Sequence, residues 1–145
     1  MNLKPLSPHR RRTGRAAWAC TVIGLALLHG AVQAADTSAQ QQLAQWSAQA
    51  GSPGQAERGR TFFTSRHGGE WSCSSCHGSP PTQAGKHAST GKPIDPLAPA
   101  ANPRAFTDSA KVDKWFRRNC KDVLQRECAP GEKADVLAYL LSLKP

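Results

Sequence analysis

A short apolar run lies near the start of the chain. After it, the pattern of apolar and polar residues is that of helices. Ala, Gln and Leu dominate residues 37–50, and Gly51 follows as a stop signal, so a helix is predicted there. A second helix is predicted from Ser52 and Pro53 to about Thr64, because a capping residue and a first-turn proline begin it.

The second half of the chain predicts two more helices. Thr107 or Asp108 is expected to cap a helix that ends near Leu124, and Pro130 to open a last helix through Leu143. Pro, Gly, Ser and Thr are frequent between the second and third of these helices, where no apolar period is found, so a long loop is predicted. No stretch alternates with the period of a strand, and the pattern predicts an all-α protein.

Charge changes the picture only at the start of the chain. The formal net charge is +9, with 19 Lys and Arg against 10 Asp and Glu. Five of the bases precede residue 35, where there is no acid: Lys4, Arg10, Arg11, Arg12 and Arg15. The remaining 14 bases against 10 acids give +4, so composition does not call for a nucleic-acid partner.

The first residues predict a secretory signal peptide. A basic stretch precedes an apolar run from Ala16 to Leu28, and small residues follow, so cleavage is expected after Ala34. The alternative, an uncleaved anchor, is disfavoured because 13 residues are too few to span the bilayer core. Cys20 precedes most of the apolar run, where a lipid-attachment cysteine is not expected. We therefore divide the chain into residues 1–34 (signal), 35–54 (helical extension) and 55–145 (the domain that carries the motif described next), and expect a periplasmic protein.

The chemistry of the mature chain begins at Cys73-Ser74-Ser75-Cys76-His77, which has the C-x-x-C-H pattern of covalent haem attachment. One helical turn holds the two thiols at the separation of the two vinyl groups of a porphyrin. The following histidine then projects beneath the ring, where its imidazole can bind the iron. We predict one haem c, attached through Cys73 and Cys76, with His77 as the proximal iron ligand.

Three other interpretations of the motif are weaker. A redox-active dithiol usually belongs to a βαβ pattern, which is not found before this segment. A zinc site needs two further ligands, for which only His67 or His87 would serve. A disulfide within so tight a loop would be strained.

The order of helices around this motif resembles the class I cytochrome c fold, in which an N-terminal helix crosses a C-terminal helix beside the haem. The residues that match the two crossing helices are Gly59, Phe62, Phe63, Leu137, Tyr139, Leu140 and Leu141. Electron carriers of that class place a methionine opposite the histidine, whereas the single methionine of this chain is Met1. A His/Met iron is therefore excluded.

Three residues are candidates for the sixth iron ligand. His67 lies too close to the attachment site to reach the other face of the haem, whereas His87, in the long loop, would give bis-His iron. Asn119 is the polar member of an apolar stripe formed by Val112, Phe116 and Val123 at helical spacing. A buried amide without a partner costs about 1–3 kcal/mol, so Asn119 needs either a hydrogen bond or an iron.

Cys120 and Cys128 lie beside Asn119 and complete an even count of four cysteines in the mature chain. Export permits a disulfide between them, which would tie the end of one helix to the start of the next. Two free thiols are the alternative.

Residues 86–128, from KHASTGK to LQREC, are similar to the oxygen-binding c-type cytochromes of the sphaeroides haem protein family, and the resemblance extends from about Ala56 to Leu143. It implies His77 on one face of the iron, a displaceable Asn119 on the other, and a disulfide between Cys120 and Cys128. It also implies a di-haem cytochrome c and a membrane cytochrome b as redox partners, with the membrane reached only through a partner. The bases of residues 111–121 are then expected to form a docking surface.

The sequence as a whole predicts a periplasmic His/Asn cytochrome that accepts an electron and binds O2 or NO when Asn119 leaves the reduced iron. A bis-His electron carrier using His77 and His87 is one alternative. A haem reductase of O2 or nitrogen oxides is another. An enzyme is less favoured, because the sequence places no second titratable group beside Asn119 to deliver protons.

Overall fold

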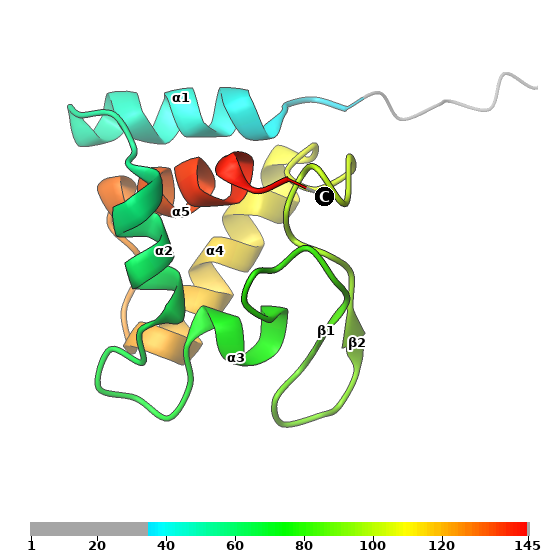
Figure 1. Cartoon of the computed structure of the whole chain (residues 1–145). Coiled ribbons are helices and arrows are strands. Elements are labelled where there is room, and N and C mark those ends of the chain that lie inside the picture. Colours follow the sequence, from blue (N-terminus) through cyan, green and yellow to red (C-terminus); the bar gives the residue numbers. More distant parts are fainter. Residues whose placement is uncertain (1–34, 145) are drawn as a thin grey trace, which may run out of the picture. The chain divides into compact units, whose positions relative to one another are not determined.

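The computed structural model describes residues 35–144, and five helices carry most of its regular structure (Figure 1). The helices are α1 (Ala39–Ala50), α2 (Ala56–Thr64), α3 (Cys73–His77), α4 (Ser109–Leu124) and α5 (Pro130–Ser142). The predicted all-α, class I cytochrome c-like fold is confirmed. The predicted signal peptide, residues 1–34, lies outside the described residues. No helix within residues 35–144 is long and apolar enough to cross a membrane.

Helix α1 follows the prediction closely. The Ser38 hydroxyl accepts a hydrogen bond from the Gln41 amide at 3.2 Å, and Gly51 ends the helix in the left-handed conformation. The buried side chain of Trp46 forms a cluster with Ala134 and Leu137 of α5, so this extension packs onto the rest of the fold.

The crossing of α2 and α5 organises the core. A Cβ atom at Gly59 would overlap the carbonyl oxygen of Asp135, so the two backbones approach as closely as only glycine allows. Phe63 of α2 packs there against Tyr139 and Leu140 of α5, and all three side chains are buried. The crossing expected from the resemblance to class I cytochromes is thus observed.

The predicted start of α2 is wrong by three residues. Ser52 and Pro53 lie in the turn after α1, and the helix begins at Ala56. The cause is a tertiary contact. The backbone N–H of Gln55 donates to the carboxylate of Asp135 at 2.7 Å, and this hydrogen bond fixes the last residue before the helix. A local capping pattern does not contain this information.

The long loop is ordered by short-range contacts, including a small antiparallel pair that the sequence did not predict. Strand β1 (Gly85–Lys86) pairs with strand β2 (Pro93–Ile94), which is too short to produce a periodic pattern. Beyond it, the amides of Leu97 and Ala98 both donate to the carbonyl of Pro81, at 3.1 and 3.0 Å. The long loop is therefore a segment ordered by backbone hydrogen bonds rather than a linker.

Helix α4 is fastened at its start from two directions. Asp108 caps it by accepting from the Lys111 amide at 2.9 Å, as predicted. The carboxylate of Asp36 accepts from the amide of Ser109 at 2.9 Å and from its hydroxyl at 3.3 Å. The carboxylates also suit the positive end of the helix dipole.

Candidate functional site

Helix α3 is a single turn that presents the attachment motif. Ser72 caps it, with its hydroxyl accepting from the Ser75 amide at 3.2 Å while the Ser75 hydroxyl accepts from the Ser72 amide at 2.9 Å. This reciprocal capping stabilises a helix otherwise too short to persist. Cys73, Cys76 and His77 thus lie together on one turn.

The two motif cysteines are not joined to each other. Burial raises the pKa of the Cys73 thiol to about 11, which is the opposite of what a nucleophilic redox dithiol needs. The sulfur of Cys76 accepts from the Ala88 amide at 3.3 Å. A Cβ at Gly85 would overlap the Cys76 carbonyl oxygen, so the β1–β2 hairpin lies directly against the motif. These features favour a structural attachment point over thiol chemistry.

The imidazole of His77 has a buried nitrogen for which the described residues provide no partner. Its Nδ1 is buried and has no hydrogen-bond partner among residues 35–144. Burial also lowers the pKa of His77, which favours the neutral imidazole that binds metals. A buried ring nitrogen without a partner costs about 1–3 kcal/mol, so a group held against this turn would relieve the cost.

Apolar side chains from separate segments meet near this turn. The rings of Phe63 and His77 are 6.2 Å apart, and Phe63 belongs to the core cluster of α2 and α5. Partly buried hydrophobic residues of α3, the long loop and α4 pack on that cluster, among them Cys73, Leu97, Phe106 and Phe116. A flat apolar cofactor would have walls from each of these segments, so the residues fit a haem.

Asn119 lies on the inner stripe of α4. Val112 and Val123 of this stripe are buried, whereas Phe116 and Asn119 are half-buried. The side-chain hydrogen bonds of α4 lie at its two ends, and within the described part of the chain the amide of Asn119 makes none. The amide is therefore available on the face of α4 that packs inward.

The structure joins Cys120 to Cys128 in a disulfide, with Cα atoms 5.5 Å apart. Both residues are buried, and the bond connects the last turn of α4 to the segment before α5. It restrains the helical turn that carries Asn119.

The other histidines considered from the sequence lie elsewhere. His87 is exposed in the β1–β2 turn, where its Nδ1 faces the Thr90 amide at 3.3 Å and the Ser89 hydroxyl at 3.2 Å. His67 is exposed after α2 and its Nε2 donates to the Phe62 carbonyl at 2.8 Å. Residues 35–144 contain no group of three or more His, Cys, Asp or Glu side chains placed to hold a metal, which argues against the zinc alternative.

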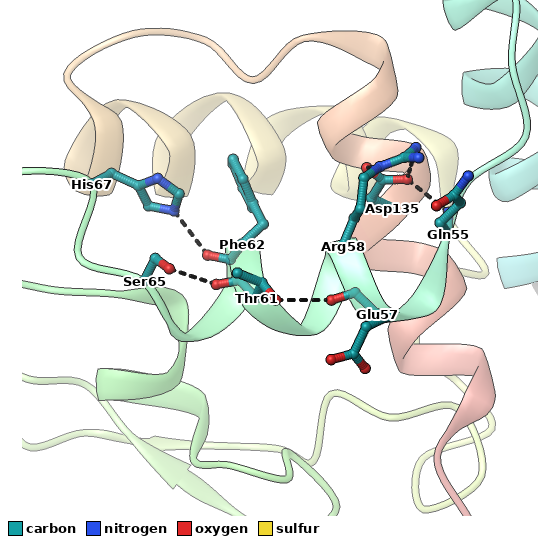
Figure 2. Close-up of a pocket in the computed structure, with 8 residues that line it drawn as sticks. All are labelled: Gln55, Glu57, Arg58, Thr61, Phe62, Ser65, His67 and Asp135. Atoms are coloured by element: carbon teal, nitrogen blue, oxygen red, sulfur yellow. Dashed lines mark hydrogen bonds and ion pairs between the residues drawn. The ribbon is translucent and has the colours of Figure 1, made fainter.

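A shallow groove of about 540 Å³ runs along α2 and is not lined by Cys73, Cys76 or His77 (Figure 2). Its polar groups are largely engaged with one another. Arg58 donates from Nε and Nη2 to the two carboxylate oxygens of Asp135, both at 2.7 Å, and His67 closes the other end. The groove lies where α2 is hydrogen-bonded to Asp135 of α5. Asp135 was not predicted from the sequence, where its only signal is a charged residue on the buried face of a helix.

Comparison with known proteins agrees with this arrangement. Residues 49–140 match the family described as "Domain of unknown function (DUF1924)". The chain is 52% identical over 119 residues to the cytochrome c-type protein SHP of Cereibacter sphaeroides, covering 79% of this chain and 92% of that protein. The structure of oxidised SHP, described as an oxygen-binding cytochrome c, superposes with a TM-score of 0.70 at 52% identity, covering 74% of this chain and 99% of that one. A solution structure of cytochrome c'' from Methylophilus methylotrophus, described in terms of haem-ligand detachment, gives 0.61 at 36% identity, covering 74% and 94%.

Proposed function

The chain belongs to the DUF1924 family and is a c-type cytochrome related to SHP, with haem c as its cofactor, and from these relationships we propose a specific ligand set and activity. Cys73 and Cys76 would hold one haem, and His77 and Asn119 would be the ligands of its iron. The haem would let the protein accept one electron and, with Asn119 displaced on reduction, bind a diatomic gas such as O2 or NO.

The observation that carries this proposal is the position of Asn119. Its amide lies half-buried on an apolar stripe, makes no hydrogen bond within residues 35–144, and is restrained by the adjacent Cys120–Cys128 disulfide. A polar side chain without a hydrogen-bond partner on an inward face is suited to bind the iron of a cofactor.

The amide oxygen of Asn119 explains why ligation would depend on the oxidation state. The bound haem supplies an iron that cycles between ferric and ferrous states. A neutral amide oxygen is a hard ligand, tolerable on ferric iron and weak on the softer ferrous form. Asn119 would therefore be the ligand released on reduction, and the disulfide would restrain its helical turn so that the amide could donate a hydrogen bond to a gas molecule.

The bis-His alternative receives little support from the position of His87. The imidazole is exposed in a tight hairpin turn and its Nδ1 interacts with Ser89 and Thr90 of the same turn. To reach the iron, His87 would have to leave these contacts, whereas Asn119 has none to lose.

Three variants test the ligand assignment by absorption spectroscopy of the purified haem protein. We expect Asn119→Ala to change the ferric spectrum and to keep or strengthen carbon monoxide binding to the ferrous form, because a competing ligand is gone. Asn119→His should give a ligand that stays on ferrous iron and should slow carbon monoxide binding. The control, His87→Ala, should leave both spectra nearly unchanged. A His87→Ala protein that turns high-spin while Asn119→Ala does not would establish the bis-His carrier instead.

We also propose that the protein works in the periplasm and receives its electron from another redox protein. The basic and apolar pattern of residues 1–34 supports export, with a mature N-terminus at Ala35. Mass spectrometry of the periplasmic fraction should find that N-terminus, and a chain beginning at Met1 would contradict it. The partners implied by the family resemblance are a di-haem cytochrome c and a membrane cytochrome b.

A further inference from the structure

The outer face of α4 carries an exposed aromatic residue. Trp115 is 48% exposed and is the one exposed large hydrophobic residue found in the described part of the chain. The Lys114 Nζ and the guanidinium carbon of Arg118 lie 5.6 and 5.2 Å from the centre of its ring. Two cations thus lie within about 6 Å of the indole on the surface, where burial does not explain its presence.

The bases around Trp115 are not neutralised by the protein itself. Lys114, Arg117, Arg118 and Lys121 are all exposed, and within residues 35–144 none of them makes an ion pair. We call these four residues and Trp115 the basic face of α4. Beyond them, Arg117 and Lys121 line a shallow hollow of about 350 Å³ together with Gln125, Arg126 and Glu127.

We propose that the basic face of α4 is the docking site of an acidic redox protein, with Trp115 as its apolar anchor. This inference rests on the proposed function, because it supplies the route by which the electron arrives. Trp and Arg are the side chains most often found at the energetic centre of protein interfaces, surrounded by residues that exclude water. The unpaired bases select a partner whose contact surface is rimmed with carboxylates around an apolar centre.

The basic face is well placed for electron transfer, because it lies on the same helix as Asn119. Trp115 precedes Asn119 by four residues, about one helical turn, so the two side chains are neighbours along α4, with Trp115 at the exposed edge of the stripe that Val112, Phe116 and Asn119 form. Side chains four residues apart on a helix have Cβ atoms about 5–6 Å apart, so a partner docked on Trp115 lies one helical turn from Asn119. In the transfer, the partner loses one electron and the ferric iron becomes ferrous.

An anionic membrane is a poorer fit to this surface than a protein. A helix that lies in a bilayer interface presents a broad apolar face, whereas the exposed side of α4 offers a single indole. Asp113 and Asp122, both exposed, interrupt the bases and would be repelled by anionic lipid. A discrete surface with mixed charges suits a protein interface.

The test uses photoreduced flavodoxin, a small acidic electron donor, and follows reduction of the ferric haem protein by stopped flow at several salt concentrations. We expect the double variant Lys114→Glu, Arg118→Glu to lower the second-order rate constant by about tenfold at low salt and to remove most of its salt dependence. Trp115→Ala should lower the rate by several-fold at all salt concentrations. The control, Lys86→Glu with Lys92→Glu, changes two exposed bases of the β1–β2 hairpin and should have a smaller effect.

Absorption spectra and the reduction potential are measured first on every variant. Unchanged values assign a lower rate to docking rather than to a change at the iron, so a failed His/Asn assignment and a failed docking site give different results. Equal rates for the wild type and both basic-face variants would overturn the proposal. Loss of binding to phosphatidylglycerol vesicles in Trp115→Ala, with the flavodoxin rate unchanged, would overturn it in favour of a membrane.

Discussion

The crossing of α2 and α5 makes a quantitative prediction through Gly59. In Gly59→Ala, the new methyl group would overlap the carbonyl oxygen of Asp135 and come within 2.9 Å of the Tyr139 Cβ. The first of these atoms belongs to the backbone and cannot rotate away, so the two helices have to separate. We expect the variant to lose stability even though alanine is the better helix former.

The magnitude follows from two opposing effects. Overpacking at a tight contact costs about 1–3 kcal/mol. Replacing a helical glycine by alanine returns about 1 kcal/mol. Because the overlap is with a backbone atom, we place the cost at the upper end and expect a net loss of about 2 kcal/mol. Gly131→Ala in α5 is the matched control. Its methyl group would lie 3.8 Å from the Ala50 Cβ, an ordinary contact, so this variant should gain up to about 1 kcal/mol.

Urea unfolding of the haem-loaded proteins, followed by far-UV circular dichroism, measures both changes. A difference of about 3 kcal/mol between the two variants corresponds to transition midpoints separated by about 1 M or more. If Gly59→Ala unfolds at the wild-type midpoint or above it, α2 and α5 do not cross at the distance described, and the reasoning fails.

Three further predictions concern the attachment site, the disulfide and the start of α5. Replacing both motif cysteines, Cys73 and Cys76, by Ala should remove the haem-stained band from a denaturing gel, and a band that persists would refute covalent attachment. Thiol counting on the unreduced, denatured protein should find neither Cys120 nor Cys128 free, and alkylation of both would exclude their disulfide. Hydrogen bonds to the carboxylate hold the pKa of Glu132 below its ordinary value, so it stabilises the fold fully above the ordinary carboxyl pKa. The stability lost in Glu132→Gln should therefore be largest near neutral pH and shrink as the pH falls through that lowered pKa, and a loss independent of pH would contradict it.

The parts of the fold that were predictable are those fixed by local chemistry. Asp108 marks the start of α4 and Gly51 the end of α1. Both were predictable because capping and left-handed termination depend on a few neighbouring residues. The start of α2 was not predictable, because the Gln55 amide is held by Asp135, which lies 80 positions away. The β1–β2 pair was equally hidden, since two residues cannot show a period.

In the candidate site, too, the residues of a local pattern were predictable and the others were not. The attachment motif is a local pattern, so Cys73, Cys76 and His77 could be named from the sequence. His87 and Asn119 stayed alternatives in the sequence, because the pattern of residues does not show that His87 interacts with Ser89 and Thr90 of its own turn. The exposure of Trp115 was not predicted, since an indole at that position is equally compatible with a buried face.

The wide separation along the chain of the two crossing helices also bears on the order of biogenesis. The pair formed by Arg58 and Asp135 joins residues 77 positions apart, and closing a loop of that length costs about 4 kcal/mol of chain entropy beyond a constant. A polypeptide delivered N-terminus first therefore stays open until α5 has arrived. The cysteines of α3 precede α5 along the chain, so haem attachment to them could take place before α2 packs on α5. Folding would in this way serve as the last step of maturation rather than its prerequisite.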